Sequence, residues 1–294
     1  MATTSTPGSA QAEIGVVGGT GLYDLPGLEG VVERVVDTPF GRPSSPVRIG
    51  TLSGRRVAFL ARHGRHHSLL PTEIPYRANV YALRALGVRQ VFAVSAVGSL
   101  REDLPPRSVV VLDQLVDRTR HRPWSFFGEG VVAHVGFSDP FCAGLRGALL
   151  AGAREAGLQA ADRGTYLNME GPQFSTRAES RLHQTLGCDV VGMTNATEAR
   201  LAREAEMCYA TLAFVTDYDA WRPHEAGVEA PEILRIIRES AAAATRTVTV
   251  AIAKAPTSDC GCRHALAAGL LTPVKDIPEA ARTRLAAILE PYLP

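Results

Sequence analysis

Short valine-rich apolar runs alternate along this chain with longer amphipathic stretches, and this alternation limits the fold more than any other feature. Short apolar runs are typical of strands that are buried on both faces of a sheet, and amphipathic stretches predict helices that cover those faces. We therefore expect an α/β fold: a single domain with a central mixed β-sheet flanked by helices. The expected strands are residues 13–18, 57–61, 90–95, 108–113 and 210–215, and the expected helices are residues 76–86, 143–156, 176–186, 197–206, 230–253 and 279–290.

Length and charge support one domain that binds neither nucleic acid nor a membrane. A chain of 294 residues can bury a sizeable core, and no long linker divides it. We expect residues 1–12 to form a disordered tail and residues 13–294 to form the domain. The 31 basic residues balance the 30 acidic ones, which argues against a basic surface for nucleic acid. No apolar run approaches the roughly 20 residues that cross a membrane, so we expect no membrane partner.

The tail and the cysteines indicate a cytoplasmic protein. The first residues lack both the positive charge and the apolar stretch of a secretory signal. Five cysteines in a chain of this length do not make a disulfide framework, so a reducing compartment is expected. Cys260 and Cys262 form a C-x-C pair. Two reduced thiols are the simpler interpretation of this pair, and a redox-active or stabilising pair is the alternative.

Anion-binding groups follow three of the expected strands. Residues 18–23 form a glycine-rich turn, residues 62–67 contain Arg62 and three histidines, and residues 95–99 combine hydroxyls with a glycine. Strand ends are where open sheets bind ligands, and arginine, hydroxyl and backbone N–H groups hold oxyanions. Each segment alone is equally compatible with a structural turn or a solvated loop. The histidines also suggest zinc, but no carboxylate or cysteine lies at ligand spacing nearby, so we expect no metal there.

Two further segments carry groups that could meet a heterocycle. In residues 170–179, Phe174 could stack on a flat ring with Glu170 beside it, although Ser175 or Thr176 could equally cap a helix. Asp217 and Asp219 follow another strand. They could bind a divalent cation, cap a helix, or act as acid and hydrogen-bond acceptor toward a heterocycle, and the sequence leaves these three open. Charged residues in 197–206 predict a partly solvated helix face.

Taken in order, these motifs resemble the 5′-methylthioadenosine phosphorylase branch of the trimeric purine nucleoside phosphorylase family. The resemblance runs from about residue 14 to about residue 253 and includes GGTGLY, ARHGRHHSLLPTEIPYRANVYALRALG, SAVGSLREDLPP, EGPQFSTRAES, MTNATEARLAREAEMCYA and TDYDAW. It implies a nucleoside phosphorylase-like fold and a cytoplasmic homotrimer with active sites near the subunit boundaries. It also implies a pentosyltransferase that uses inorganic phosphate as co-substrate, with no cofactor and no metal.

The resemblance also implies a role for each matching residue. It places Met193 against the ribose, and Phe174 and Ser175 beside the purine. Asp217 and Asp219 match the residues that recognise the base, and we expect Asp217 to protonate N7 of the leaving purine. The resemblance further implies that His134 contacts the 5′ end of the substrate in a neighbouring subunit. The phosphate site would contain Thr20, Arg62, His63, Ser95, Ala96 and Thr194.

The acid pair favours a 6-aminopurine, because a carboxylate accepts from an amino group and repels a carbonyl. We therefore expect phosphorolysis of 5′-methylthioadenosine to adenine and 5-methylthioribose 1-phosphate, in purine and methionine salvage. The alternative is a purine nucleoside or methylthioinosine phosphorylase that acts on 6-oxopurines. Ser175 and Ala230 are the expected specificity positions, since Ala230 stands where the family usually has a bulkier valine. The chain also has Gln173 where the family often has arginine.

Overall fold

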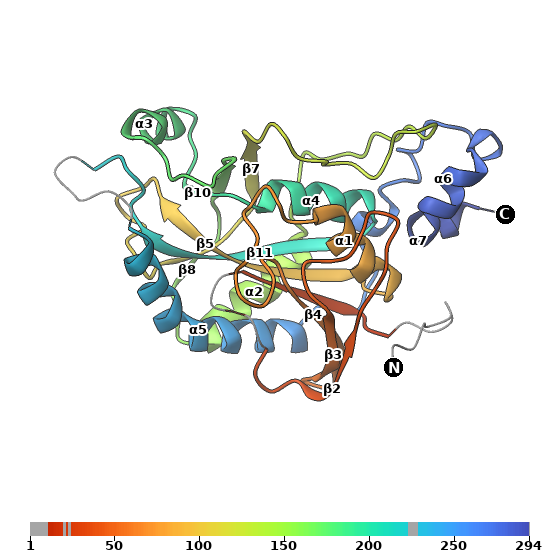
Figure 1. The fold of residues 1–294 in the computed structure, drawn as a ribbon. Coiled ribbons are helices and arrows are strands. Elements are labelled where there is room, and N and C mark those ends of the chain that lie inside the picture. The colour runs from red at the N-terminus through yellow and green to blue at the C-terminus, as the bar shows by residue number, and fades with distance from the viewer. Residues whose placement is uncertain (1–10, 20–21, 23–24, 223–228, 294) are drawn as a thin grey trace.

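The computed structural model describes residues 11–19, 22, 25–222 and 229–293. A mixed sheet forms its centre, in agreement with the expected α/β class (Figure 1). Its strands are β1 (Ile14–Gly18), β2 (Glu29–Arg34), β3 (Val47–Leu52), β4 (Arg55–Ala61), β5 (Gln90–Ser99), β6 (Val109–Val111), β7 (Gln114–Asp117), β8 (Ala160–Ala161), β9 (Thr165–Asn168), β10 (Val190–Gly192) and β11 (Cys208–Asp217). The long path runs β2-β3-β4-β1-β5-β10-β9-β7, and β11 branches from β5 to β6 and β8.

The four strands that matter most for the site run in parallel. β1 pairs with β4 on one side and β5 on the other, and β5 pairs with β11. Their carboxyl ends therefore meet at one edge of the sheet. The register sets Gly18 beside Ala61, so that the Arg62 N–H donates to the Gly18 carbonyl at 2.9 Å. At the other junction Asp217 lies opposite Gly98, after an irregularity in β11.

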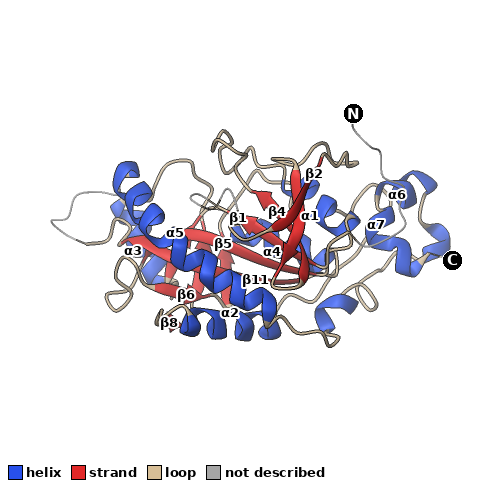
Figure 2. Cartoon of the chain, turned by 90° about the horizontal axis from the view of Figure 1, so that it is seen from below, coloured by secondary structure: helices blue, strands red, loops and turns tan. Residues whose placement is uncertain are grey.

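Helices cover both faces of the sheet. α1 (Tyr76–Ala85) and α4 (Asn195–Glu204) pack together on one face, and α2 (Ala143–Glu155) and α5 (Ala230–Ala253) pack together on the other (Figures 1 and 2). α3 (Arg177–Thr185) lies at one end of the molecule. The last segment contains the short helices η1 (Gly261–His264), η2 (Val274–Asp276), α6 (Glu279–Arg284), α7 (Ala286–Leu289) and η3 (Glu290–Tyr292). In the described part of the chain, no helix is long and apolar enough to span a bilayer.

Several sequence predictions need correction or extension. The expected helix over residues 279–290 is divided at Leu285 into α6 and α7. The antiparallel strands β2 and β3 were not expected, because β2 is largely exposed and lacks a buried apolar run. Residues 1–10 of the expected tail lie outside the described residues. Ala12, which we assigned to that tail, is buried, and its N–H donates to the Leu86 carbonyl.

The helix expected to have a partly solvated face agrees with that prediction only at Arg200 and Arg203, which are partly exposed. Glu198 and Glu204 of α4 are both buried, with 3% and 9% of their surface exposed. Glu204 accepts hydrogen bonds from the Ser125 hydroxyl and the Phe126 N–H. Glu198 pairs with an arginine that directly follows β4, as described below. Charge alone predicted solvent contact, but partners distant in the sequence satisfy these carboxylates inside the protein.

Candidate active site

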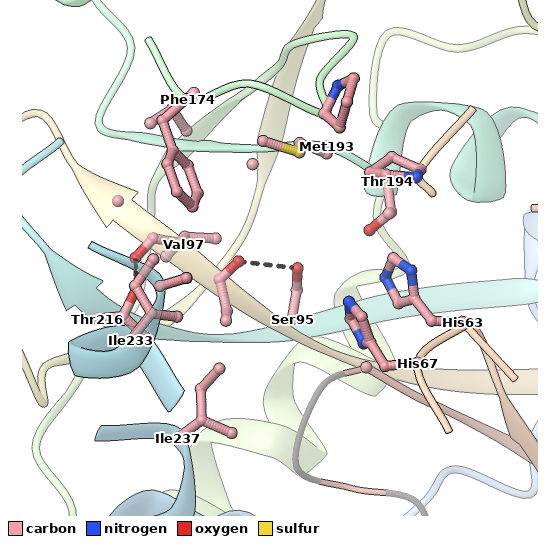
Figure 3. Close-up of a pocket in the computed structure, with 18 of the residues that line it drawn as sticks. His63, His67, Ser95, Val97, Phe174, Met193, Thr194, Thr216, Ile233 and Ile237 are labelled. Atoms are coloured by element: carbon pink, nitrogen blue, oxygen red, sulfur yellow. Dashed lines mark hydrogen bonds between the residues drawn. The ribbon is translucent and has the colours of Figure 1, made fainter. Parts of the chain in front are cut away.

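A pocket of about 440 Å³ opens where the carboxyl ends of β1, β4, β5 and β11 meet. Polar groups gather at one end of it, around His63, Ser95 and Thr194, and apolar groups surround the other end, around Phe174, Val97 and Ile233 (Figure 3). The sequence-predicted residues that line the pocket are Arg62, His63, Ser95, Ala96, Phe174, Met193, Thr194, Asp217, Asp219 and Ala230. Residues from widely separated segments thus form one site.

Arg62 provides the fixed positive charge of the polar end. Its side chain is almost completely buried and forms a bidentate ion pair with Glu198, with Nη2 at 2.8 Å from Oε2. Nη1 also donates to the Val94 carbonyl at 3.0 Å. Burial by itself would lower the pKa of the guanidinium, but the Glu198 carboxylate outweighs it and raises the pKa above its usual value. Arg62 therefore stays charged in a rigid position.

Glu198 is the main site-supporting residue that the sequence did not reveal. The Tyr209 hydroxyl donates to its Oε2 at 2.7 Å. Tyr209 also lies 2.9 Å from the Asn195 side-chain oxygen, which accepts from the Thr211 hydroxyl at 2.6 Å. These residues come from α4 and β11, so the network fixes Arg62 against two elements. No local sequence motif marks it, because its members meet only through the sheet register.

His63 completes the wall next to Arg62. Burial, with a contribution from the Arg62 charge, lowers the pKa of His63 to about 4. Its Nδ1 lies 2.9 Å from the Leu69 carbonyl, which can only accept, so Nδ1 carries the proton of the neutral ring. Nε2 is then a hydrogen-bond acceptor. The ring stacks on His67 with centroids 4.4 Å apart, and His67 also lines the pocket, although the sequence marked only its segment, residues 62–67, and gave this residue no role (Figure 3).

Small donors complete the polar end. Ser95 lies on β5, and Thr194 is the residue before the first turn of α4. A helix N-terminus favours an anion through its free N–H groups and its dipole. Gly19 lines the same end, and a side chain there would collide with Arg62, since a Cβ added at Gly19 would lie 2.8 Å from Nη1. Thr20 lies outside the described residues.

The acid pair is held at the end of β11. The Thr216 hydroxyl donates to Asp217 Oδ2 at 2.6 Å, and the Asp219 N–H donates to Asp217 Oδ1 at 2.8 Å. Burial, with a smaller contribution from Asp219, raises the pKa of Asp217 to about 6. Asp219 has a buried Oδ2 with no hydrogen-bond partner among the described residues. Asp217 is therefore suited to donate a proton near neutral pH, and Asp219 to accept a hydrogen bond from a ligand.

The wall around the acid pair is apolar. Phe174 is 41% exposed and points into the pocket, and Met193 lies beside it (Figure 3). Ser175 does not line the pocket. Its hydroxyl lies 3.7 Å from the sulfur of Met169, which does, so Ser175 supports the wall from behind. Thr176 caps α3 with Glu179, which confirms one of the two capping candidates.

Glu170 does not lie beside a ring as one interpretation suggested. Its carboxylate pairs with Arg122 at 2.9 Å and accepts from the Arg120 N–H at 2.5 Å. Arg122 in turn donates to the Tyr76 hydroxyl and to the carbonyls of Glu170 and Met193. Glu170 therefore fixes the loop that carries Met193 and does not face the pocket.

α5 provides an apolar wall that was predicted only in part. Ala230 was predicted, and Ile233, Leu234 and Ile237 line the pocket with it. These three residues follow Ala230 by three, four and seven positions, which is the helical period of one face, so the signal was present in the sequence.

His134 does not line the pocket of its own chain. It is exposed, and its N–H donates to the Gly269 carbonyl at 2.8 Å.

Fold and site together define a class of protein: an α/β protein with a pocket at the carboxyl ends of its parallel strands, where a buried arginine lies at one end and a pair of aspartic acids at the other. The family model of the Phosphorylase superfamily matches residues 13–253. The chain belongs to this superfamily. This result confirms the resemblance given by the sequence motifs, the fold class, and the expected enzyme class of pentosyltransferase.

Individual relatives agree with this assignment. An S-methyl-5′-thioadenosine phosphorylase of Koribacter versatilis is 50% identical over 96% of this chain and 97% of its own length. A solved methylthioadenosine phosphorylase from an antarctic soil metagenomic library has a TM-score of 0.90 at 43% identity, covering 96% of this chain and all of that one. The Schistosoma mansoni methylthioadenosine phosphorylase in complex with adenine has a TM-score of 0.82 at 32% identity, covering 95% and 98% of the two chains.

Proposed function

We propose that this protein cleaves 5′-methylthioadenosine with inorganic phosphate to give adenine and 5-methylthioribose 1-phosphate. One observation carries the proposal: a single pocket joins a buried, permanently charged arginine to a partly buried aspartic acid whose pKa is raised to about 6. Phosphorolysis needs an anion on one side of C1′ and a proton donor on the other. The names of the similar proteins favour the same substrate.

Phosphate would bind at the polar end, to Arg62, His63, Ser95, Thr194 and the Ala96 backbone, with Thr20 as the sixth contact. Hydroxyls and N–H groups around one arginine hold phosphate without fully neutralising it, so it can still attack. A neutral His63 offers Nε2 to a protonated phosphate oxygen. The attack at C1′ passes through an oxocarbenium-like state, as in glycosidases.

The purine would lie between Phe174 and the acid pair, with Met193 against the ribose. Asp217 would donate its proton to N7 as electron density moves onto the leaving base. The free acceptor of Asp219 would take a hydrogen bond from the 6-amino group. A 6-oxopurine offers an acceptor at that position and would leave the carboxylate mispaired, which costs about 1–3 kcal/mol or more. Ser175 would influence base selection through Met169.

The 5′ substituent would contact the apolar face of α5. Ile233 and Ile237 on this face suit a methylthio group better than a hydroxyl. Ala230 leaves room for larger groups, so the enzyme would tolerate some bulk at this end. We further propose a cytoplasmic homotrimer in which the exposed His134 reaches the 5′ end of a neighbouring subunit's substrate.

Substrate identity can be tested by comparing four nucleosides at saturating phosphate. We expect kcat/KM to be highest for 5′-methylthioadenosine and lower for adenosine. Methylthioinosine and inosine should each have a kcat/KM at least about tenfold below that of the matching 6-amino nucleoside, because mispairing costs more than about 1.4 kcal/mol. Cleavage of methylthioinosine as fast as methylthioadenosine would contradict the role given to Asp219. It would instead favour the 6-oxopurine alternative.

A further inference from the structure

Four of the five cysteines converge far from the active site. Cys142 precedes α2, Cys208 opens β11, and Cys260 and Cys262 flank the start of η1. Their four Sγ atoms lie within 4.8 Å of one another, and all four are free thiols. The sequence showed only the C-x-C pair, because the other two positions are 118 and 52 residues from Cys260 (260−142 and 260−208). The fold brings the three segments together.

The spacing of these sulfurs is close to that of a metal–thiolate site. Cys142 Sγ and Cys260 Sγ are 3.8 Å apart. A zinc ion with four thiolates at about 2.3 Å in a tetrahedron places its sulfurs about 3.8 Å apart. A disulfide would require a bond of about 2.05 Å between two of them. Sulfur ligands in a tetrahedral set select zinc or iron among the common metals.

We propose that Cys142, Cys208, Cys260 and Cys262 bind one structural Zn²⁺ ion. This proposal differs from our sequence expectation, in which the C-x-C pair was two thiols or a redox pair and no metal was bound. Binding would release the thiol protons still present and give a complex with a net charge of −2. Cys142 stands at the N-cap of α2, where the helix dipole stabilises a negative sulfur.

The cysteines have apolar surroundings, and the site is open to a metal ion on one side. Cys142, Cys208 and Cys262 belong to the apolar core between the sheet and the helices α2 and α5. Cys260 is only partly buried at the edge of the same core, so an ion can reach the site from that side. Four thiols packed as simple apolar side chains would not need to gather their sulfur atoms within 4.8 Å of one another.

The position of the cluster assigns it a structural role. Cys208 and Asp217 are the first and last residues of β11, so nine steps of about 3.3 Å put them about 30 Å apart. The cluster therefore lies at the opposite end of the sheet from the acid pair. Zinc there would tie the segment after α5 to β11 and to α2, and would not take part in the reaction.

Metal content tests the proposal directly. The full chain would be produced with added zinc, purified under reducing conditions and analysed by elemental mass spectrometry. We expect about one zinc per chain in the wild type and near loss of zinc in Cys142→Ser and in the double variant Cys260→Ser/Cys262→Ser. The matched control is Cys188→Ala, because Cys188 is also buried but lies in a separate core cluster. It should keep its zinc.

Stability and spectroscopy give two further readouts. Loss of zinc should lower Tm by roughly 5–10 °C and change kcat at 25 °C by less than about twofold. Protein loaded with Co²⁺ in place of zinc should have the strong visible bands of tetrahedral cobalt–thiolate, which decides the matter even if the serine variants do not fold. A wild-type protein without stoichiometric metal, with iron in place of zinc, or with a disulfide among the four cysteines would overturn the proposal.

Discussion

At the scale of single residues, the site depends on two ionisable side chains, Arg62 and Asp217, whose surroundings have opposite effects on their charge. Arg62 keeps its charge inside the protein because Glu198 neutralises it, and this pairing leaves its position fixed before any ligand arrives. Asp217 differs from Arg62 because no opposite charge among the described residues stabilises its ionised form. It has hydrogen-bond donors but no cationic partner among the contacts described above, so burial favours its protonated form. Arg62 is therefore held in its charged form, whereas Asp217 can gain and lose a proton at a pH close to neutral.

Replacing Glu198 with glutamine should therefore reduce both stability and phosphate binding. Removing one partner of a buried ion pair leaves an uncompensated charge and costs about 3–5 kcal/mol. Urea unfolding should reveal this loss, and KM for phosphate should rise because Arg62 is no longer held. Glu239→Gln is the control, since Glu239 forms only surface pairs with Arg107 and Arg235 and should change neither quantity. An unchanged Glu198→Gln protein would contradict the supporting role of the network.

The raised pKa of Asp217 predicts the pH dependence of the reaction. The acid must be protonated to donate, so kcat/KM should fall as pH rises above about 6, as the protonated fraction declines. Asp217→Asn should lower kcat by about 10²–10⁴ and remove this part of the profile. If kcat/KM of the Asp217→Asn variant falls at high pH in the same way, the fall belongs to the titration of another group, such as phosphate itself.

At the scale of elements, β5 and β11 position the acid pair by close approach. Gly98 of β5 faces Asp217 across the pairing, and a Cβ at Gly98 would lie 2.9 Å from Asp217 Oδ1 and 3.3 Å from Asp219 Cβ. The absence of a side chain at this position lets both carboxylates stay at the strand end. Two parallel strands and one glycine thus set the geometry of the proton donor.

Gly98→Ala should for this reason lower kcat/KM by at least about tenfold while the protein stays folded, because a displaced proton donor loses much of its contribution. Gly147→Ala is a matched control in α2, where no atom lies within 4 Å of the added Cβ. The control should keep full activity and gain a few tenths of a kcal/mol, up to about 1, in stability. Full activity in Gly98→Ala would mean that the acid pair has more freedom than the structure indicates.

The helix α5 should determine which 5′ groups are accepted. Ala230→Val narrows the pocket at the first turn of α5, next to Ile233 and Leu234. We expect kcat/KM for a bulky 5′-alkylthio analogue to fall by roughly tenfold or more relative to methylthioadenosine, from an overpacking cost of about 1–3 kcal/mol. Steady-state kinetics with both substrates gives this ratio. An unchanged ratio would place the 5′ group elsewhere in the pocket.

At the scale of the whole molecule, the sequence predicted what depends on local pattern and missed what depends on contacts across the fold. Arg62, Ser95 and Asp217 were found because each lies at or next to the end of an expected apolar strand, and strand ends gather at one edge. Glu198 was missed because Arg62, the charge that it neutralises, is 136 residues away, and Cys142 and Cys208 were missed because they are more than 50 residues from Cys260. β2 was missed because an exposed edge strand has no buried apolar run to signal it.

The pocket of one chain also leaves apolar groups in contact with solvent. Phe174 and Leu234 are both 41% exposed at its lining, and His134 is exposed well outside it. A neighbouring subunit that covers this side of the pocket would bury the first two and supply its own His134. This arrangement is consistent with the proposed trimer, in which each active site is completed by a second chain.

Product analysis with and without phosphate is the most direct test of the proposed reaction. Purified protein would be incubated with 5′-methylthioadenosine, and both adenine and the sugar product would be quantified. We expect adenine and 5-methylthioribose 1-phosphate in equal amounts, and almost no adenine when phosphate is left out. Equal release of adenine without phosphate, with free 5-methylthioribose as the sugar product, would identify a hydrolase and contradict the role of the Arg62 end of the pocket.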